Sequence, residues 1–282
     1  MPELPEVETI ARGLDQRVAG DVVESVWLGE KPEPLKSPAK EIAAVLEHTR
    51  IAKVRRVGKH IVFDLERAAR NGRGKPQRHG QWIVHLGMTG RMQVAGPRDE
   101  LLKHTHAVLK LKSGRELRFV DPRRFGRLAV VKLDEKAPAG FAAPGDEPLE
   151  SPADRFAELF RKRKTPIKSA LLNQKLLSGV GNIYADEALF RAGIRPRRRA
   201  SSLTREQLHK LHAALKEVLK EAIALGGSSV SDYVDAEGRE GFFQLQHRVY
   251  GREGEPCLVC GTPIKRVIIA GRSSHYCPKC QH

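Results

Sequence analysis

The N-terminal part of the chain starts with a helical hydrophobic pattern. Its apolar side chains recur at steps of three and four residues: Val7, Ile10, Leu14 and Val18. This spacing predicts an amphipathic helix, and Pro5 suits its first turn. Strand-like runs follow, and Ser113-Gly114 between two of them is typical of a hairpin turn. The runs are 22–27, 60–65, 82–86, 107–111, 117–120 and 128–133. They predict an antiparallel sandwich or barrel, with an exposed polar loop at residues 69–80.

The pattern changes to helical in the second half of the chain. Residues 134–152 hold four prolines and no periodicity, which indicates a linker. Beyond it, Phe156, Leu159 and Phe160 share one helical face. Thr204 and Gln207 form a plausible capping box for a long helix that Gly226-Gly227 would end. The apolar stripe of this helix is typical of core packing: Leu208, Leu211, Leu215, Val218, Leu219 and Ile223.

Composition is typical of a folded globular protein. Of 282 residues, 40% are hydrophobic and 30% are charged, unlike a disordered chain. No apolar run approaches the roughly 18 residues that a membrane span needs. Residues 1–8 hold three glutamates and no lysine or arginine, unlike the positively charged start of a secretory signal. We therefore expect no membrane association and a reducing, cytoplasmic location.

The charge of the chain indicates a polyanionic partner. Lysine and arginine number 50 against 34 acids, which gives a net charge of +16 and a pI of about 9.9. Eleven of these bases and only two acids lie within residues 159–200. Nucleic acid is the polyanion that such clustering favours.

Gly179 and Gly181 precede a predicted helix that starts near Asn182, and backbone N–H groups at such a turn can approach a phosphate.

The four cysteines predict one structural zinc ion. They form two Cys-x2-Cys pairs separated by sixteen residues: Cys257, Cys260, Cys277 and Cys280. Two such pairs can hold zinc tetrahedrally and leave no coordination position for a substrate. His275 is a competing ligand, but Cys277 has the better spacing. The alternative is two disulfides, which a reducing compartment disfavours. The β-rich residues 262–276 between the pairs predict a hairpin finger.

The N-terminus offers a reactive amine. Removal of the initiator methionine would leave Pro2 with a free secondary amine. An α-amine has a pKa of about 8, against about 10.4 for lysine, so it is substantially neutral at physiological pH. Such an amine can attack a sugar C1′ and form an iminium that favours elimination, with Glu3 and Glu6 near it for proton transfer. The structural alternative is that Pro2 and Pro5 only pre-organise the helix start.

Five further motifs and this N-terminus resemble the formamidopyrimidine-DNA glycosylase family, the bacterial base-excision repair enzymes for oxidised purines. The motifs are PELPEVET at the start, HLGMTG (85–90), DPRRFG (121–126), GVGNIYADEALF (179–190), VYGREGEPC (249–257) and the four-cysteine finger. The resemblance implies an α+β multidomain protein with an antiparallel β-sandwich, a helix–two-turn–helix domain and a zinc-finger hairpin. We place these domains at residues 1–134, 153–240 and 241–282, with 135–152 as the linker.

The resemblance also implies catalytic roles. Pro2 is the nucleophile that forms a Schiff base with the deoxyribose, and Glu3 is the general acid that protonates the sugar. Glu6 positions the damaged nucleotide. Lys59 assists β-elimination, although alone it would be interpreted as a solvated strand charge. Arg272 contacts DNA and assists δ-elimination, although alone it would be a generic phosphate contact.

DNA contacts follow from the same resemblance. The damaged base must leave the stack before chemistry at C1′, and Met88, Arg123 and Phe125 would fill the gap. The alternative for Met88 and Phe125 is core packing. Arg163 stands where the family commonly has lysine, so its contact geometry is open. Residues 226–243 correspond to a loop over the extruded base. Other implied contacts are His104, Lys168 and Asn182.

The resemblance therefore implies a monomeric DNA glycosylase and abasic-site lyase that acts on damaged double-stranded DNA. It would remove 8-oxoguanine and formamidopyrimidines and nick the strand by β,δ-elimination. One alternative is the related endonuclease VIII type, which acts on oxidised pyrimidines and has glycine in place of Leu4. The other is a non-catalytic, zinc-containing nucleic-acid-binding protein.

Overall fold

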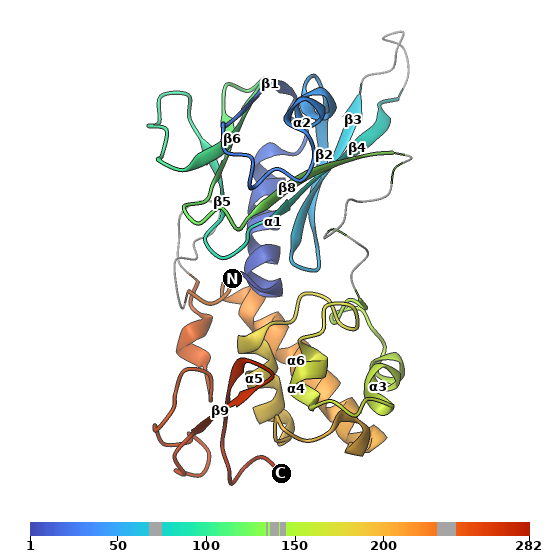
Figure 1. The fold of residues 1–282 in the computed structure, drawn as a ribbon, viewed down its shortest axis with the longest axis vertical. Helices are drawn as coiled ribbons and strands as arrows, with labels where there is room; N and C mark the ends of the chain where they lie inside the picture. The colour runs from blue at the N-terminus through green and yellow to red at the C-terminus, as the bar shows by residue number, and fades with distance from the viewer. Residues whose placement is uncertain (68–74, 134, 136–140, 142–144, 230–240) are drawn as a thin grey trace. The chain divides into compact units, whose positions relative to one another are not determined.

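The computed structural model describes residues 1–67, 75–133, 135, 141, 145–229 and 241–282. The chain forms two compact units, and each is described by itself (Figure 1). The first consists of Met1–Pro2, Glu6–Ala143 and Ser229–Gly241. The second consists of Glu3–Pro5, Pro144–Ser228 and Phe242–His282. No helix among the described residues is long and apolar enough to cross a membrane.

The first unit contains two four-stranded antiparallel sheets (Figure 1). The order in one sheet is β1-β6-β7-β5, with bounds Val23–Leu28, Thr105–Leu111, Glu116–Val120 and Arg91–Ala95. The order in the other is β2-β3-β4-β8, with bounds Arg50–Val57, His60–Arg67, Gln77–His85 and Arg127–Lys132. This arrangement confirms the predicted antiparallel sandwich.

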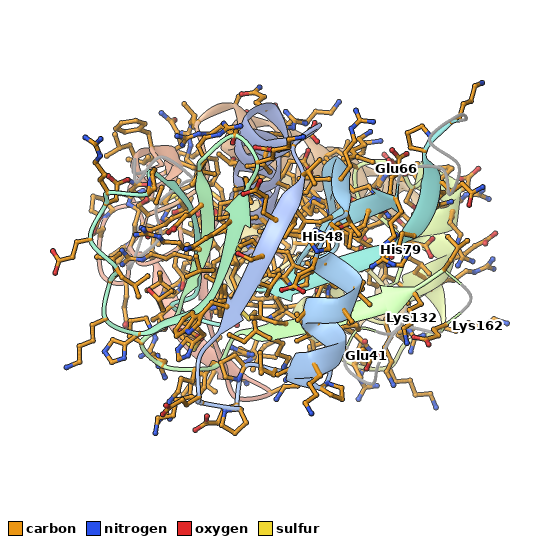
Figure 2. The ribbon with its side chains drawn as sticks, turned by 90° about the horizontal axis from the view of Figure 1, so that it is seen from above. Glu41, His48, Glu66, His79, Lys132 and Lys162 are labelled. Atoms are coloured by element: carbon orange, nitrogen blue, oxygen red, sulfur yellow. The ribbon has the colours of Figure 1, made fainter. Side chains whose placement is uncertain are left out.

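Two helices complete the first unit. Helix α1 (Leu4–Val18) buries the predicted stripe of Val7, Ile10, Leu14 and Val18 in one core with side chains from both sheets. Phe63 of β3 and Phe119 of β7 belong to that core and are fully buried. Helix α2 (Ala39–Leu46) adds Ile42 and Leu46. Figure 2 shows Glu41 of α2 beside Lys132 of β8, and the two form an ion pair at 3.2 Å.

The second unit is helical and ends in a hairpin. Its α-helices are α3 (Ala153–Arg161), α4 (Ile167–Leu171), α5 (Asn182–Ala192) and α6 (Arg205–Ala224). The hairpin is formed by β9 (Lys265–Ile269) and β10 (Arg272–Tyr276). The predicted capping box at the start of α6 is confirmed, since Gln207 N–H donates to the Thr204 hydroxyl and Thr204 N–H donates to the Gln207 amide. The apolar face of α6 packs in the core of this unit.

The structure departs from the sequence-based expectations in two loop regions. The predicted loop at residues 69–80 is wrong for residues 77–80, because they form the start of β4 opposite β3, and Gly80 also pairs with Lys132 of β8. Residues 68–74 lie outside the described residues. Within the predicted linker, Phe141 is buried against Val62 and Ile83. The domain bounds 1–134, 153–240 and 241–282 stay a prediction.

Candidate active site

Glu3 lies at the N-terminal end of α5. Its side chain is 5% exposed, and Ile183 N–H donates a 3.2 Å hydrogen bond to Oε1. Gly181 is the N-cap residue of α5, and a Cβ there would lie 2.2 Å from the carboxyl carbon of Glu3. Leu4 N–H donates to the carbonyl of Gly179, which has φ +82°. The glycine turn that sequence suggested for a phosphate therefore encloses a carboxylate of the same chain.

The other predicted catalytic residues near the N-terminus belong to the first unit. Pro2 is partly exposed. Glu6 is 2% exposed and Lys59 is 8% exposed. Lys59 follows Gly58, whose φ is +59°, in the tight turn between β2 and β3. Its burial does not fit the alternative of a solvated strand charge.

Arg272 is exposed at the tip of the β9–β10 hairpin. The two-residue turn before it has positive φ at both Ala270 (+47°) and Gly271 (+75°), as tight hairpins with right-handed strand twist require. The strand that it begins is held by α5, because the backbone N–H of His275 donates to Asp186 Oδ2 at 2.9 Å. Asn182 Nδ2 donates to the hydroxyl of Ser273 at 3.2 Å.

Lys168 lies inside the second unit. It is 1% exposed, its Nζ is 2.6 Å from Asp186 Oδ1, and it donates to the carbonyl of Ser273 at 2.6 Å. Burial lowers the pKa of this ammonium, and the nearby Asp186 carboxylate opposes that shift. These contacts attach β10 to α4 and α5. The implied phosphate contact of Lys168 stays a prediction.

Two adjacent acids of α5 have structural roles that the sequence did not suggest. Asp186 accepts from Lys168 and His275, as described above. The carboxylate of Glu187 accepts three consecutive backbone N–H groups, those of Arg248, Val249 and Tyr250, at 2.9–3.0 Å. Burial raises the pKa of Glu187, and these three donors oppose that rise. The signal available in the sequence was an acidic pair within a strongly basic stretch.

The residues expected to fill the gap in the DNA lie on turns of the first unit. Met88 is 44% exposed and Phe125 is 53% exposed, so neither fits the alternative of core packing. The guanidinium of Arg123 lies over the ring of Phe125, 4.7 Å from its centroid. His104 is exposed and has φ +70°. Arg163, in the second unit, is exposed and donates to the carbonyl of Leu159.

The four cysteines form a site that fits zinc. Their sulfur atoms all lie within 4.8 Å of one another. The Cys257–Cys280 and Cys260–Cys277 sulfur distances are 3.9 and 3.5 Å, close to the ~3.8 Å edge of a tetrahedron with zinc–sulfur bonds of about 2.3 Å. All four are free thiols, so the alternative of two disulfides is not found. His275 instead faces Asp186, with Nδ1 at 3.2 Å from Oδ2.

Family comparisons cover most of the chain. The profile described as "Formamidopyrimidine-DNA glycosylase N-terminal domain" matches residues 1–128. The "Formamidopyrimidine-DNA glycosylase H2TH domain" profile matches 144–234, and "Zinc finger found in FPG and IleRS" matches 254–282. The formamidopyrimidine-DNA glycosylase of Solibacter usitatus is 47% identical over 287 residues, which span 100% of this chain and 99% of that protein. The chain belongs to the formamidopyrimidine-DNA glycosylase family.

Solved structures of formamidopyrimidine-DNA glycosylases agree with this assignment. The MutM (Fpg) protein of Thermus thermophilus superposes with a TM-score of 0.85 at 43% identity, covering 99% of this chain and 98% of that chain. A Lactococcus lactis FPG mutant in complex with Fapy-dG containing DNA gives a TM-score of 0.86 at 33% identity, with both chains fully covered. As a member of the formamidopyrimidine-DNA glycosylase family, the chain is a base-excision repair DNA glycosylase.

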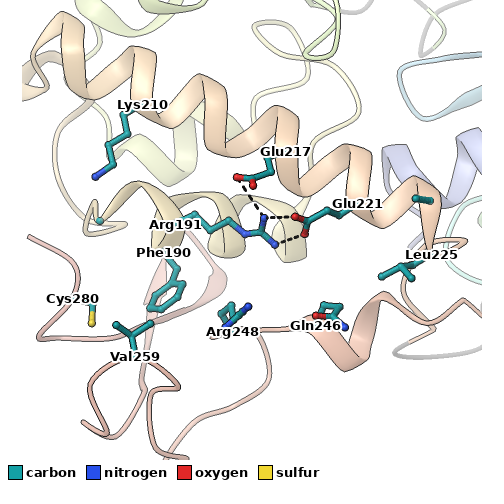
Figure 3. Close-up of a pocket in the computed structure, with 12 residues that line it drawn as sticks. Phe190, Arg191, Lys210, Glu217, Glu221, Leu225, Gln246, Arg248, Val259 and Cys280 are labelled. Carbon is teal, nitrogen blue, oxygen red and sulfur yellow. Dashed lines mark hydrogen bonds and ion pairs between the residues drawn. The ribbon is translucent and has the colours of Figure 1, made fainter.

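A separate pocket of about 840 Å³ lies in the second unit, between α5, α6 and residues 246–259 (Figure 3). Arg191 on its wall donates to Glu221 and pairs with Glu217. Among the predicted site residues, only the zinc ligand Cys280 lines it. The catalytic residues implied by the sequence lie elsewhere, so the pocket does not define the active site.

Proposed function

We propose that this protein is a bifunctional DNA glycosylase and abasic-site lyase that removes oxidised purines, with the amine of Pro2 as its nucleophile. The observation that carries the proposal is the enclosure of Glu3. A carboxyl group next in sequence to the reactive proline is buried, is hydrogen-bonded to Ile183 N–H, and occupies space that only a glycine at 181 leaves open. A solvated acid with no function would need none of these features.

The proposed chemistry proceeds through a covalent imine. The Pro2 nitrogen bonds to C1′ as the bond from C1′ to the base breaks, and the base leaves with the electron pair and takes up a proton. Glu3 protonates the sugar oxygen and helps to open the ring, which gives an iminium. Loss of a C2′ proton, assisted by Lys59, breaks the C3′–O bond. Loss of the C4′ proton, assisted by Arg272, then breaks the C5′–O bond. Each eliminated oxygen leaves on a phosphate end of the strand, and water hydrolyses the iminium and frees the Pro2 amine.

The DNA is contacted from both units in this proposal. Met88, Arg123 and Phe125 fill the gap that the extruded nucleotide leaves, and Glu6 positions that nucleotide. The exposure of the three gap-filling side chains supports their assignment, because a wedge must project from the protein. Phosphate contacts come from Lys168 and Asn182, and further DNA contacts come from His104, Arg163 and Arg272. The segment expected to cover the extruded base, 226–243, lies outside the described residues over 230–240.

The four cysteine thiolates would hold one zinc ion in the finger that carries Arg272. The ion would supply folding free energy to residues 254–282. The chain's own residues perform the catalytic steps given above.

Substrate choice is tested with two matched duplexes, one with 8-oxoguanine and one with thymine glycol. We expect faster release of 8-oxoguanine. Leu4 supports this expectation, because the pyrimidine-specific relatives have glycine at this position. Much faster release of thymine glycol would instead assign the endonuclease VIII specificity.

Covalent trapping with borohydride tests the catalytic proposal against a non-catalytic DNA-binding protein. An enzyme that uses Pro2 becomes linked to damaged DNA, whereas a binding protein does not. We expect Pro2→Gly to reduce trapping sharply. We expect Glu3→Gln to reduce base excision but to spare duplex binding, and full excision by this variant would remove Glu3 from its role.

A further inference from the structure

In the first unit, two neighbouring turns each connect a strand of one sheet to a strand of the other sheet. The turn at residues 86–90 leads from β4 to β5, and the turn at 121–126 leads from β7 back to β8 (Figure 1). Strand pairing fixes both ends of the two turns, because His85 pairs with Arg127 and Arg91 pairs with Val120. The first turn carries Met88, and the second carries Arg123 and Phe125.

The side chain of Asp121 joins these two turns. Its Oδ1 accepts a 2.6 Å hydrogen bond from the Thr89 hydroxyl and a 3.2 Å bond from Arg123 N–H. Its Oδ2 accepts a 2.7 Å bond from Gly126 N–H. The residue is fully buried. One carboxylate therefore closes the 121–126 turn on itself and attaches it to the 86–90 turn.

The backbone of Asp121 binds a third segment. Its N–H donates to the carbonyl of His104 at 3.0 Å, and its carbonyl lies 2.9 Å from Nε2 of His106. His104 has φ +70°, an uncommon conformation for a residue other than glycine. The segments 86–90, 104–106 and 121–126, which we call the Asp121 junction, thus meet at one residue.

Glycines let the turns of the Asp121 junction approach closely. Gly87 has φ +62°, and a Cβ on it would lie 2.5 Å from the carbonyl carbon of Phe125. A Cβ on Gly126 would lie 2.4 Å from Phe119 Cζ and 3.1 Å from Asp121 Oδ2. The contact between the turns is therefore made by backbone, and the Asp121 hydrogen bonds have no bulky side chain between their partners.

Rigid turns matter here because the projecting side chains have little packing of their own. Met88 and Phe125 are 44% and 53% exposed, and Arg123, which lies over the Phe125 ring, is itself exposed. Side-chain packing therefore fixes their directions only in part. Inserting a side chain into stacked bases is more favourable when its backbone is already ordered, because less entropy is lost on binding. A buried carboxylate with several N–H and O–H donors orders backbone strongly.

We propose that Asp121 is the positioning residue that holds Met88, Arg123 and Phe125 as one preformed wedge for insertion into the DNA stack. This inference rests on the gap-filling role proposed above for those three side chains. Asp121 itself is buried and touches no DNA. It acts through Thr89, Arg123 N–H and Gly126 N–H.

Two substitutions of different severity test the proposal. Asp121→Asn replaces one acceptor oxygen by a donor, which opposes either Gly126 N–H or the Thr89 and Arg123 donors. Thr89→Val removes a single hydroxyl at nearly constant volume, so it remains informative if Asp121→Asn folds poorly. Asp64→Asn is the matched control, since Asp64 is a partly buried carboxylate of β3 in the same unit. Its hydrogen bonds go to Arg55 and Gln81, outside the Asp121 junction.

Two measurements separate wedge insertion from the chemistry at Pro2. The first is single-turnover excision from an 8-oxoguanine duplex, followed in parallel by the fluorescence of 2-aminopurine placed in the complementary strand beside the orphaned base, which rises when the stack opens. The second is borohydride trapping on a single-stranded abasic oligonucleotide, which needs no gap to be filled.

We expect Asp121→Asn to slow duplex excision by about tenfold or more, as loss of about 1.4 kcal/mol predicts, and to delay the fluorescence rise. Thr89→Val should show the same pattern more weakly, with trapping within about twofold of wild type for both.

Three results would count against this reasoning in different ways. Duplex excision at the wild-type rate by both Asp121→Asn and Thr89→Val would overturn the positioning role. Equal losses on the duplex and the single strand, shared by Asp64→Asn, would show a general effect on the fold and also overturn it. A normal fluorescence rise and normal excision by Phe125→Ala would instead refute the wedge assignment in the proposed function. Defective Phe125→Ala beside normal Asp121→Asn would refute the inference about Asp121 alone.

Discussion

The substitution Gly181→Ala tests whether the position of Glu3 controls base excision. A Cβ at this position would lie 2.2 Å from the Glu3 carboxyl carbon and 2.3 and 2.6 Å from its two oxygens. The backbone at Gly181 has φ −130° and ψ −162°, an extended conformation that alanine adopts without strain. The carboxyl group is the end of a flexible side chain, so it is the part that moves.

The size of the displacement sets the expected effect. Ordinary contact between a Cβ and its neighbours begins near 3.4 Å, so the carboxyl group must retreat by about 1 Å and lose its bond from Ile183 N–H. Misplacing a catalytic group by about 1 Å can slow a reaction about 100-fold. Replacing glycine by alanine at an N-cap costs about 1 kcal/mol, which lowers the melting temperature by only about 2–4 °C. Excision should therefore fall far more than stability.

The assay compares single-turnover excision from an 8-oxoguanine duplex with binding to a duplex that carries an abasic-site analogue. We expect Gly181→Ala to excise about 100-fold more slowly and to bind as wild type does. Gly96→Ala is the matched control, because the three atoms nearest to its Cβ would belong to the Asp99 side chain, at 3.4 Å or more. Excision by Gly181→Ala at the rate of Gly96→Ala would refute the role of the enclosed carboxyl group. Equal losses of excision and binding would refute it as well.

Three further predictions concern a buried ion pair, a buried histidine and the zinc finger. Lys168→Met leaves Asp186 buried without its cation, so we expect a loss of about 3–5 kcal/mol in denaturant unfolding; an unchanged unfolding curve would show the ion pair to be dispensable. Burial beside His60 and Arg127 lowers the pKa of His85 to about 3, whereas an unfolded histidine has a pKa of about 6.5. Keeping His85 neutral therefore makes the free energy of unfolding depend on pH. It is unaffected above pH 6.5 and falls by up to about 1.4 kcal/mol per pH unit as the pH drops toward 3. We expect the melting temperature to fall less between pH 7 and pH 5 in His85→Gln than in the wild type. Chelation should remove one zinc ion per chain and abolish duplex binding, and retained binding by metal-free protein would contradict the finger's role.

The strands that sequence predicted are those with clear alternation or strong β-branched content. The strand β2 was missed because the pairing with β3 shifts register between Ile51 and Lys53, so the apolar positions Ile51 and Val54 do not alternate. The polar segment Gln77–Gly80 was predicted to be a loop, although its pairing with β3 places it in β4. Local pattern cannot report a strand whose stability comes from its neighbours. Two further elements, β5 with five residues and α2 with eight, were also missed.

Some features of the candidate site were likewise predictable from the sequence, and others were not. The cysteine ligands were predictable because their spacing alone specifies the geometry, and their sulfur atoms do lie together. The roles of Asp121 and of Asp186 were not predictable, because their partners are distant in sequence. Thr89 lies 32 positions from Asp121, and His275 lies 89 positions from Asp186. A buried carboxylate is recognised only when the donors around it are known.

The most direct test of the central claim is to locate the covalent bond in the trapped complex. The protein is reacted with a duplex containing 8-oxoguanine, reduced with borohydride and digested, and the peptide that carries the sugar is sequenced by mass spectrometry. We expect the adduct on the nitrogen of Pro2, in a peptide that lacks Met1. An adduct on Lys59 or another lysine, or full cleavage of the duplex by protein that retains Met1, would contradict the claim.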